Sequence, residues 1–340
     1  MSYKRFDQED VVVSAESVTA PVWTGDISTL TTFFTSSTQI GGTSADYYYD
    51  IYQTASTLDS ARVQFSVAYA DKKGSGSLYY NSNVAGKSPS STVYGQYRNL
   101  VLGTEEEDFT FGTITSEYFY AITIDRARYK EKLLPGTLAL KLHVSGSGAE
   151  ITLTDNSQVV STTTFTDAGR VFELVSGSLG TVYTGLETNG YTGNSGSYGK
   201  LLPDIGVLLI NGKALDAPAV SGGLALSTGR NANTADANNG KFYDLLTLSG
   251  SFRCQSEETI TSNFVFVRAR NSEFNYSTNP SLITGSGELR HNVMIDTPQS
   301  YITAVGLYND NNDLLAVAKL SSPLKKNFTK EALVRIKLDF

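Results

Sequence analysis

Histidine and cysteine, the side chains used most often for general-base, nucleophilic and metal chemistry, are nearly absent from this sequence. The 340 residues include two histidines and one cysteine. His143 and His291 stand in different segments without a cysteine or a suitably spaced carboxylate nearby, and Cys254 has no nucleophile signature around it. The sequence therefore indicates no catalytic residue and no metal site, and we expect a protein that is not an enzyme.

Long apolar runs and dense basic runs are also missing. With 34 acidic and 27 basic side chains the net charge is −7, so the phosphate attraction that nucleic-acid binding requires is weak. Apolar runs such as residues 207–210 are far too short to span a bilayer, and the start carries no apolar leader. The lone Cys254 suits a reducing compartment. We expect a protein made in a reducing cytoplasm, with no nucleic-acid partner and no membrane insertion.

Glycine-rich phosphate loops and calcium loops are not present in recognisable form. The stretches 74–76, 146–148 and 285–287 lack both the third glycine of a dinucleotide fingerprint and the Lys-Ser/Thr of a phosphate loop. The polar run 309–313 has alternating oxygen ligands, but Leu314 stands where a calcium loop needs glycine. All four patterns favour turns between strands, so we expect no cofactor.

What the sequence does contain is typical of β structure. Charged residues make up 18% of the chain, and 20 Tyr, 16 Phe and 30 Gly suit pleated surfaces joined by turns. Strict alternation of apolar and polar residues recurs in 61–69, 138–144 and 334–340, which predicts strands with one buried face, the last ending on Phe340. The predicted fold class is mainly β, with antiparallel sheets or β-sandwich domains and one or two short helices.

Local signals place some turns and helices. Asn211-Gly212 between two apolar runs predicts a tight hairpin, and 301–308 is expected to return through a polar turn into 314–320. Helical spacing occurs in 91–102, and a turn or two is expected in 125–133 before Pro135-Gly136.

Shifts in composition suggest three segments. Residues 1–135 are rich in aromatic and charged clusters and predict a mainly-β domain with short helices. Residues 136–250 are rich in Gly, Ser and Thr and predict an inserted or projecting β-sandwich. Aromatic strands return in 251–340, so this segment is expected to share a core with 1–135.

Tyrosine clusters are the best candidates for contact surfaces. Tyr47, Tyr48 and Tyr49, with Tyr52 nearby, put neighbouring rings on both faces of a strand, and tyrosine is common at interfaces. For Trp23, Phe33 and Phe34, core packing explains the sequence at least as well. The acidic run 105–108 and the pair 325–326 are further candidates for contacts with unlike partners.

Several segments of the chain resemble virion structural proteins of contractile-tailed (myovirus-type) bacteriophages, particularly those that infect cyanobacteria. The similar segments are residues 3–14, 29–39, 94–100, 125–136 and 274–280. A further one is the expected hairpin, where Gly306-Leu307-Tyr308 is followed by a polar turn and Leu315-Ala316-Val317, similar to a hairpin of phage tail and fibre-attachment proteins. The resemblance covers the first and third segments and brings no catalytic residues with it.

This resemblance implies a component of a phage particle, in the tail or baseplate, with the neck and the capsid surface as other positions. Its expected partners are other virion proteins and copies of itself in a symmetric assembly. The interface candidates are Tyr47, Tyr48, Tyr49, Tyr52, Tyr308 and Phe340. Two alternatives stay open at this point: a carbohydrate-binding module for host attachment, because tyrosines beside polar loops can stack on sugars, and, more distantly, a depolymerase.

Overall fold

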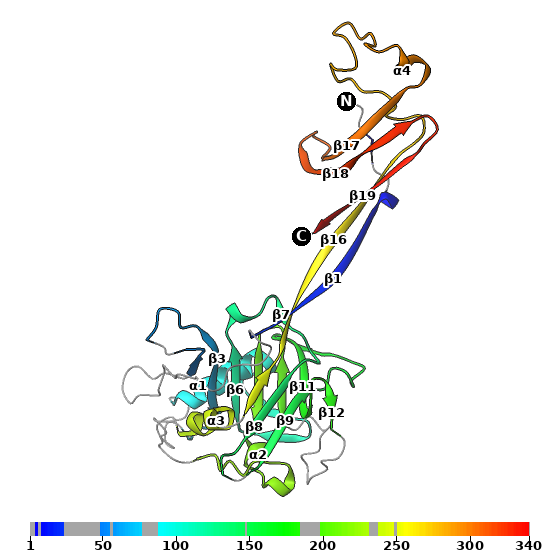
Figure 1. Cartoon of the computed structure of the whole chain (residues 1–340). Helices are drawn as coiled ribbons and strands as arrows, with labels where there is room; N and C mark the ends of the chain where they lie inside the picture. Colours follow the sequence, from blue (N-terminus) through cyan, green and yellow to red (C-terminus); the bar gives the residue numbers. More distant parts are fainter. Residues whose placement is uncertain are drawn as a thin grey trace. The chain divides into compact units, whose positions relative to one another are not determined.

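The computed structural model describes residues 4–5, 8–23, 48–54, 57–76, 88–146, 148–183, 198–230, 237–247 and 250–339. Strand accounts for 46% of the chain and helix for 15%, and the sheets are large and antiparallel, which confirms the predicted mainly-β class (Figure 1). The predicted aromatic residues Phe33, Phe34, Tyr47 and Phe340 lie outside the described residues.

The helices and strands are as follows. The strands are β1 (Val11–Pro21), β2 (Tyr49–Tyr52), β3 (Val63–Asp71), β4 (Phe109–Phe111), β5 (Ile114–Ser116), β6 (Tyr118–Ile124), β7 (Lys132–Leu133), β8 (Ala139–His143), β9 (Glu150–Asp155), β10 (Thr164–Thr166), β11 (Gly169–Ser178), β12 (Thr181–Val182), β13 (Gly199–Leu202), β14 (Val207–Asn211), β15 (Ser251–Arg253), β16 (Gln255–Ala269), β17 (Gln299–Tyr308), β18 (Leu314–Asn327) and β19 (Ala332–Asp339). The helices are α1 (Pro89–Leu102), α2 (Gly212–Asp216), α3 (Ala237–Thr247) and α4 (Val293–Asp296), with 3₁₀ turns η1 (Gln8–Asp10), η2 (Arg126–Arg128) and η3 (Ala219–Ser221).

The chain divides into two compact units. Unit 1 comprises Met1–Ser17 and Thr259–Phe340, and unit 2 comprises Val18–Glu258. The predicted boundaries at 135 and 250 therefore do not match the units. Strands from 48–135 and from 136–250 belong to one sheet, joined where β14 pairs with β6, and they share one hydrophobic core, so the middle segment is not a separate sandwich. The third segment shares its unit with the first 17 residues and not with the rest of 1–135.

Unit 2 is built on an 11-stranded antiparallel sheet that curls into a half-barrel. Its order is β15-β8-β9-β11-β13-β14-β6-β3-β2, with β10 and β12 added beside β11. Phe65, Val67 and Tyr69 of β3 share one buried face, as the alternation predicts. The other face of β3 is also buried, because Gln64 is 2% exposed and Ala68 is 0% exposed, so the prediction of a single buried face was wrong for this strand.

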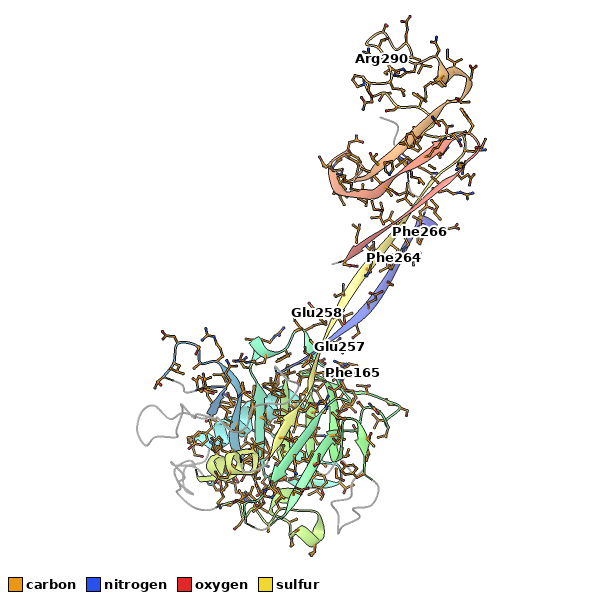
Figure 2. All side chains as sticks on the ribbon, viewed as in Figure 1. Phe165, Glu257, Glu258, Phe264, Phe266 and Arg290 are labelled. Atoms are coloured by element: carbon orange, nitrogen blue, oxygen red, sulfur yellow. The ribbon has the colours of Figure 1, made fainter. Side chains whose placement is uncertain are left out.

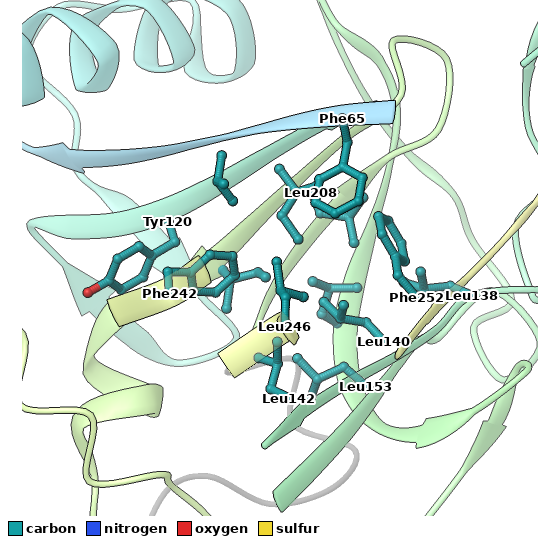
Figure 3. Packing of buried hydrophobic residues seen from close by; sticks show 14 of the residues in the cluster. Phe65, Tyr120, Leu138, Leu140, Leu142, Leu153, Leu208, Phe242, Leu246 and Phe252 are labelled. Carbon is teal, nitrogen blue, oxygen red and sulfur yellow. The ribbon is translucent and has the colours of Figure 1, made fainter. Parts of the chain in front are cut away.

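The core on the first face of the sheet is filled by side chains from many strands and from α3 (Figure 3). Tyr120 stacks on Phe242 of α3 with ring centroids 4.8 Å apart. Trp23 is buried against Phe65 and Phe252, which supports core packing as the interpretation of this tryptophan. The strands supply the walls of this core, and α3 closes it.

The second face of the sheet carries α1, which covers small side chains. Ala68 and Ala70 of β3 and Ala121 of β6 are fully buried in the cluster that contains the apolar face of α1. The helix was predicted over 91–102 and spans Pro89–Leu102, with proline at its start and Gly103 at a φ of 68° at its end. Small residues on this face let the helix approach the sheet closely.

The hairpin predicted at Asn211-Gly212 was wrong, because the chain enters helix α2 there. Asn211 keeps a φ of −64°, and its side-chain oxygen accepts a hydrogen bond from the Lys213 N–H, so it caps a helix. A Cβ on Gly212 would lie 2.3 Å from the Tyr118 ring, which explains glycine at the first helical position. The Asn-Gly pair serves helix capping and close packing in place of a turn with positive φ angles.

Unit 1 contains two small sheets and, between β16 and β17, the short helix α4. The segments of β1, β16 and β19 that belong to this unit form one, in which Ser262–Ala269 of β16 pairs antiparallel with β19. Strands β17 and β18 form the other, and their pairing confirms the hairpin predicted for 301–308 and 314–320. The core between these sheets has three buried members, Val265, Leu307 and Ile336.

Candidate functional site: exposed apolar strands of unit 1

The described members of the tyrosine cluster lie at the edge of unit 2. Tyr48 packs on the core beneath α1 and Tyr49 on the opposite core, as expected for neighbours in a strand. The Tyr48 hydroxyl donates to Gln96 Oε1 at 3.3 Å, and burial is the main reason that its pKa is raised. Tyr52 is half-buried. Tyr48 and Tyr49 therefore pack partly inward, and the role of the tyrosine cluster as a contact surface stays a prediction.

The side chains that could act as general bases, nucleophiles or metal ligands lie far apart in the described part of the chain. His143 lies on β8 opposite Glu150, His291 is exposed in unit 1, and Cys254 is buried in unit 2. Burial raises the pKa of the Cys254 thiol, so this sulfur stays protonated. Among the described residues, no three metal-ligating side chains gather and no helix is long and apolar enough to cross a bilayer.

A shallow depression of about 490 Å³ lies on unit 2 at the end of β6, lined by Ser66, Thr123, Ile124, Asp125, Arg126, Tyr129, Asp204 and Ile205. Its aromatic ring is Tyr129, which is only 7% exposed. The Arg126 guanidinium lies 4.8 Å from the ring centroid, and a Cβ on Gly206 would lie 2.7 Å from the ring edge. A sugar needs a free aromatic face to stack on, so this depression does not favour a carbohydrate site.

Asp204 in this depression is held by Arg170 through several hydrogen bonds. Its carboxylate accepts from the Arg170 backbone N–H at 2.7 Å and from the guanidinium at 2.7 Å. Burial alone would raise the pKa of Asp204, but the bonds from Arg170 outweigh burial and lower it.

The Arg170–Asp204 pair is expected to make unit 2 sensitive to acid. Because the folded pKa of Asp204 lies below its unfolded pKa, the pair stabilises the fold at pH above the unfolded pKa, and this is lost as pH falls through the folded pKa. We expect Asp204→Asn to lower the free energy of unfolding by about 1–2 kcal/mol at pH 7. Denaturation at pH 7 and at acid pH should show the difference between variant and parent shrinking in acid. A constant difference would rule out the charge as its cause.

The outer face of the β17–β18 hairpin carries an apolar patch that we call the hairpin face, made of Gly306, Tyr308, Leu314 and Val317. The side chains of Tyr308, Leu314 and Val317 are 37%, 52% and 61% exposed. A Cβ on Gly306 would lie 2.9 Å from the Tyr308 ring and 3.3 Å from Leu314, so these two side chains converge over the glycine. The opposite face of the hairpin, with Leu307 and Ala316, turns into the core.

Unit 1 as a whole exposes more large hydrophobic side chains than it buries. Its buried hydrophobic residues, among those described, are Val265, Ala269, Met294, Leu307, Ala332 and Ile336. Its exposed large ones are Val11, Val12, Val13, Tyr276, Leu289, Val293, Ile295, Tyr301, Tyr308, Leu314, Leu315, Val317, Leu324, Phe328 and Leu333. Figure 2 draws the described side chains as sticks and labels Phe264 and Phe266 on β16 of this unit. Unit 2 shows the opposite ratio and buries most of its large apolar residues.

The two charged contact candidates differ in the structure. Asp108 of the acidic run pairs with Lys72 at 2.6 Å, while residues 105–107 are exposed. Lys326 is 0% exposed, so it cannot present its charge to a partner, whereas its neighbour Lys325 is exposed. Burial lowers the pKa of Lys326. The interpretation of 325–326 as a charged surface pair was therefore wrong for Lys326.

Sequence reasoning found Tyr308 but not the rest of the hairpin face. Leu314 and Val317 belong to a hairpin that resembles phage proteins, yet alternation alone does not tell which of its two faces stays exposed. The missed signal was the run 314–318, which has no charged residue and would be unusual for a strand at the surface.

Compared with known proteins, the chain matches no family model, no curated protein and no solved structure.

Proposed function

We propose that this chain is a non-enzymatic structural component of a tailed-phage particle, in the tail or baseplate, and that it acts through contacts with other subunits. The observation that carries the proposal is the excess of exposed over buried large hydrophobic side chains in unit 1. The sequence resemblance to virion proteins in the segments of unit 1, including the hairpin 301–320, gives the class of assembly.

The physical argument is that unit 1 gains little by folding alone. A two-stranded sheet is marginally stable in water, and one of the two sheets of this unit has two strands. Burying a Leu, Val or Phe side chain fully contributes about 1.5–3 kcal/mol. Contiguous apolar surface left in water is typical of surfaces that bind other proteins. Neighbouring subunits would supply the burial that unit 1 lacks.

Immunogold electron microscopy of purified particles tests the proposal. Antibodies against unit 2 are the right probe, because unit 1 is expected to be covered by neighbours. We expect gold label at the tail or baseplate of particles from the phage that encodes this chain. Label at the neck or capsid surface would keep a structural role and correct the position. Intact and dissociated particles that both lack the chain would contradict the proposal.

A glycan array with the full chain separates this function from carbohydrate binding. A structural subunit should show no saccharide preference, and Tyr129, the aromatic residue of the depression on unit 2, is only 7% exposed and offers little surface for a sugar to stack on. Selective binding to one saccharide class would favour the host-attachment alternative.

A further inference from the structure

Strand β18 has an unpaired edge. Its sheet has two strands, so within the described residues β17 covers one edge of β18 and no strand covers the other. No backbone hydrogen bond joins 314–320 to any described element other than β17. An exposed row of N–H and C=O groups readily accepts a further strand.

The first five residues of β18 also carry no edge protection, in contrast to the later part of the strand, which contains Lys319 and Pro323. Natural proteins guard exposed edges with charged residues or proline, but residues 314–318 have neither. Leu314, Leu315 and Val317 are 52%, 68% and 61% exposed. Such a segment invites uncontrolled aggregation unless a defined partner covers it.

The charges that flank this segment make it complementary to itself. Asp313 stands three residues before Ala316 and Lys319 three residues after it, and both are exposed. If two β18 strands pair antiparallel about a two-fold axis at Ala316, Asp313 of each copy meets Lys319 of the other. The same register sets Leu315 against Val317, and a two-fold axis makes every such contact twice.

The charge of unit 1 permits the approach of a second copy. Unit 1 contains 11 basic and 11 acidic residues, so it is neutral, and the net charge of −7 belongs to unit 2. Two copies that meet through unit 1 therefore avoid the like-charge repulsion that contact through unit 2 would bring.

We propose that β18 of one chain pairs antiparallel with β18 of a second copy around Ala316, so that two β17–β18 hairpins form one four-stranded sheet. The inference rests on the proposed structural function and names the partner of the exposed hairpin. Pairing gives the backbone groups of the free edge their hydrogen bonds and removes Leu315 and Val317 from water.

Charge reversal in the full-length chain tests this pairing by sedimentation equilibrium. Asp313→Lys or Lys319→Asp alone would place like charges opposite each other twice in each dimer, and we expect each to raise the dimer dissociation constant at least about tenfold. The double variant restores opposite charges and should recover parental affinity. Asp313 also accepts a hydrogen bond from Asn309 within the turn, whereas no such bond is present for Lys319 among the described contacts, so Lys319→Asp separates pairing from turn geometry.

Val317→Lys, with Val159→Lys as its control, adds a matched pair. These valines are 61% and 62% exposed and lie in unit 1 and unit 2. We expect loss of the dimer for Val317→Lys and no change for Val159→Lys. A monomeric parent chain, equal effects of both substitutions, or a double charge variant that stays weak would overturn the proposed pairing. Gold label on particles does not depend on this contact, so the function could stand while the pairing fails.

Discussion

Replacing Phe119 with alanine is expected to lower the free energy of unfolding of unit 2 by about 3–5 kcal/mol, because the ring lies at the centre of the core beneath α1. Phe119 is 0% exposed. Its ring centroid lies 4.8 Å from that of Phe109 and 5.4 Å from that of Tyr94, so the cavity would be lined by rigid rings that cannot easily collapse. Chemical denaturation with tryptophan fluorescence of Trp23, which is buried in unit 2, would report the loss.

Phe165→Ala is the matched control for this experiment. The Phe165 side chain is 71% exposed on β10 of the same unit (Figure 2), so the same atoms are removed without opening a cavity. Its effect should stay within about 0.5 kcal/mol. Equal losses for the two variants would show that Phe119 is not enclosed as described.

The buried ring of Phe119 also shows how far the sequence could lead. Alternation identified the face of β3 that holds Phe65 and Val67, and helical spacing placed α1 within two residues of its start. Both signals are local, because side-chain direction in a strand or helix follows from backbone geometry. That the opposite face of β3 is buried under α1 depends on a helix that begins 18 residues after the strand ends, and alternation within the strand cannot report it.

Polar residues misled the sequence reasoning in the same way. Asn211-Gly212 fits a hairpin by composition, but Tyr118, almost a hundred residues earlier in the chain, fixes the backbone there. Lys325 and Lys326 look alike in sequence, and their different environments are set by the loop 271–275, which lies far away along the chain. For the hairpin face, the apolar run was visible in the sequence, but its exposure depends on which face meets β16 and β19.

Lys326→Met is expected to destabilise unit 1 by about 3 kcal/mol while leaving unit 2 unchanged. The ammonium donates to Asn275 Oδ1 at 2.8 Å, to the Asn271 carbonyl at 3.0 Å and to the Asn327 carbonyl at 3.1 Å. These three acceptors match the three donors of a protonated lysine. Methionine keeps much of the apolar stem but removes all three bonds, and buried acceptors without donors cost about 1–3 kcal/mol each before relaxation.

The loss of stability should appear first in the two segments that the hydrogen bonds of Lys326 connect. Its bonds join the end of β18 to the loop that follows β16, and the Asn275 side-chain amide adds a bond to the Asn271 carbonyl at 2.8 Å. Hydrogen exchange read by mass spectrometry should therefore speed up in β17 and β18 of the variant, with unit 2 peptides unaffected. Lys325→Met is the control, because the adjacent lysine is exposed and should change exchange little. If both substitutions accelerated exchange equally, the buried ammonium would not be what holds unit 1 in shape. If Lys326→Met alone does so, the buried ammonium stabilises the hairpin whose free edge is proposed to pair with a second copy.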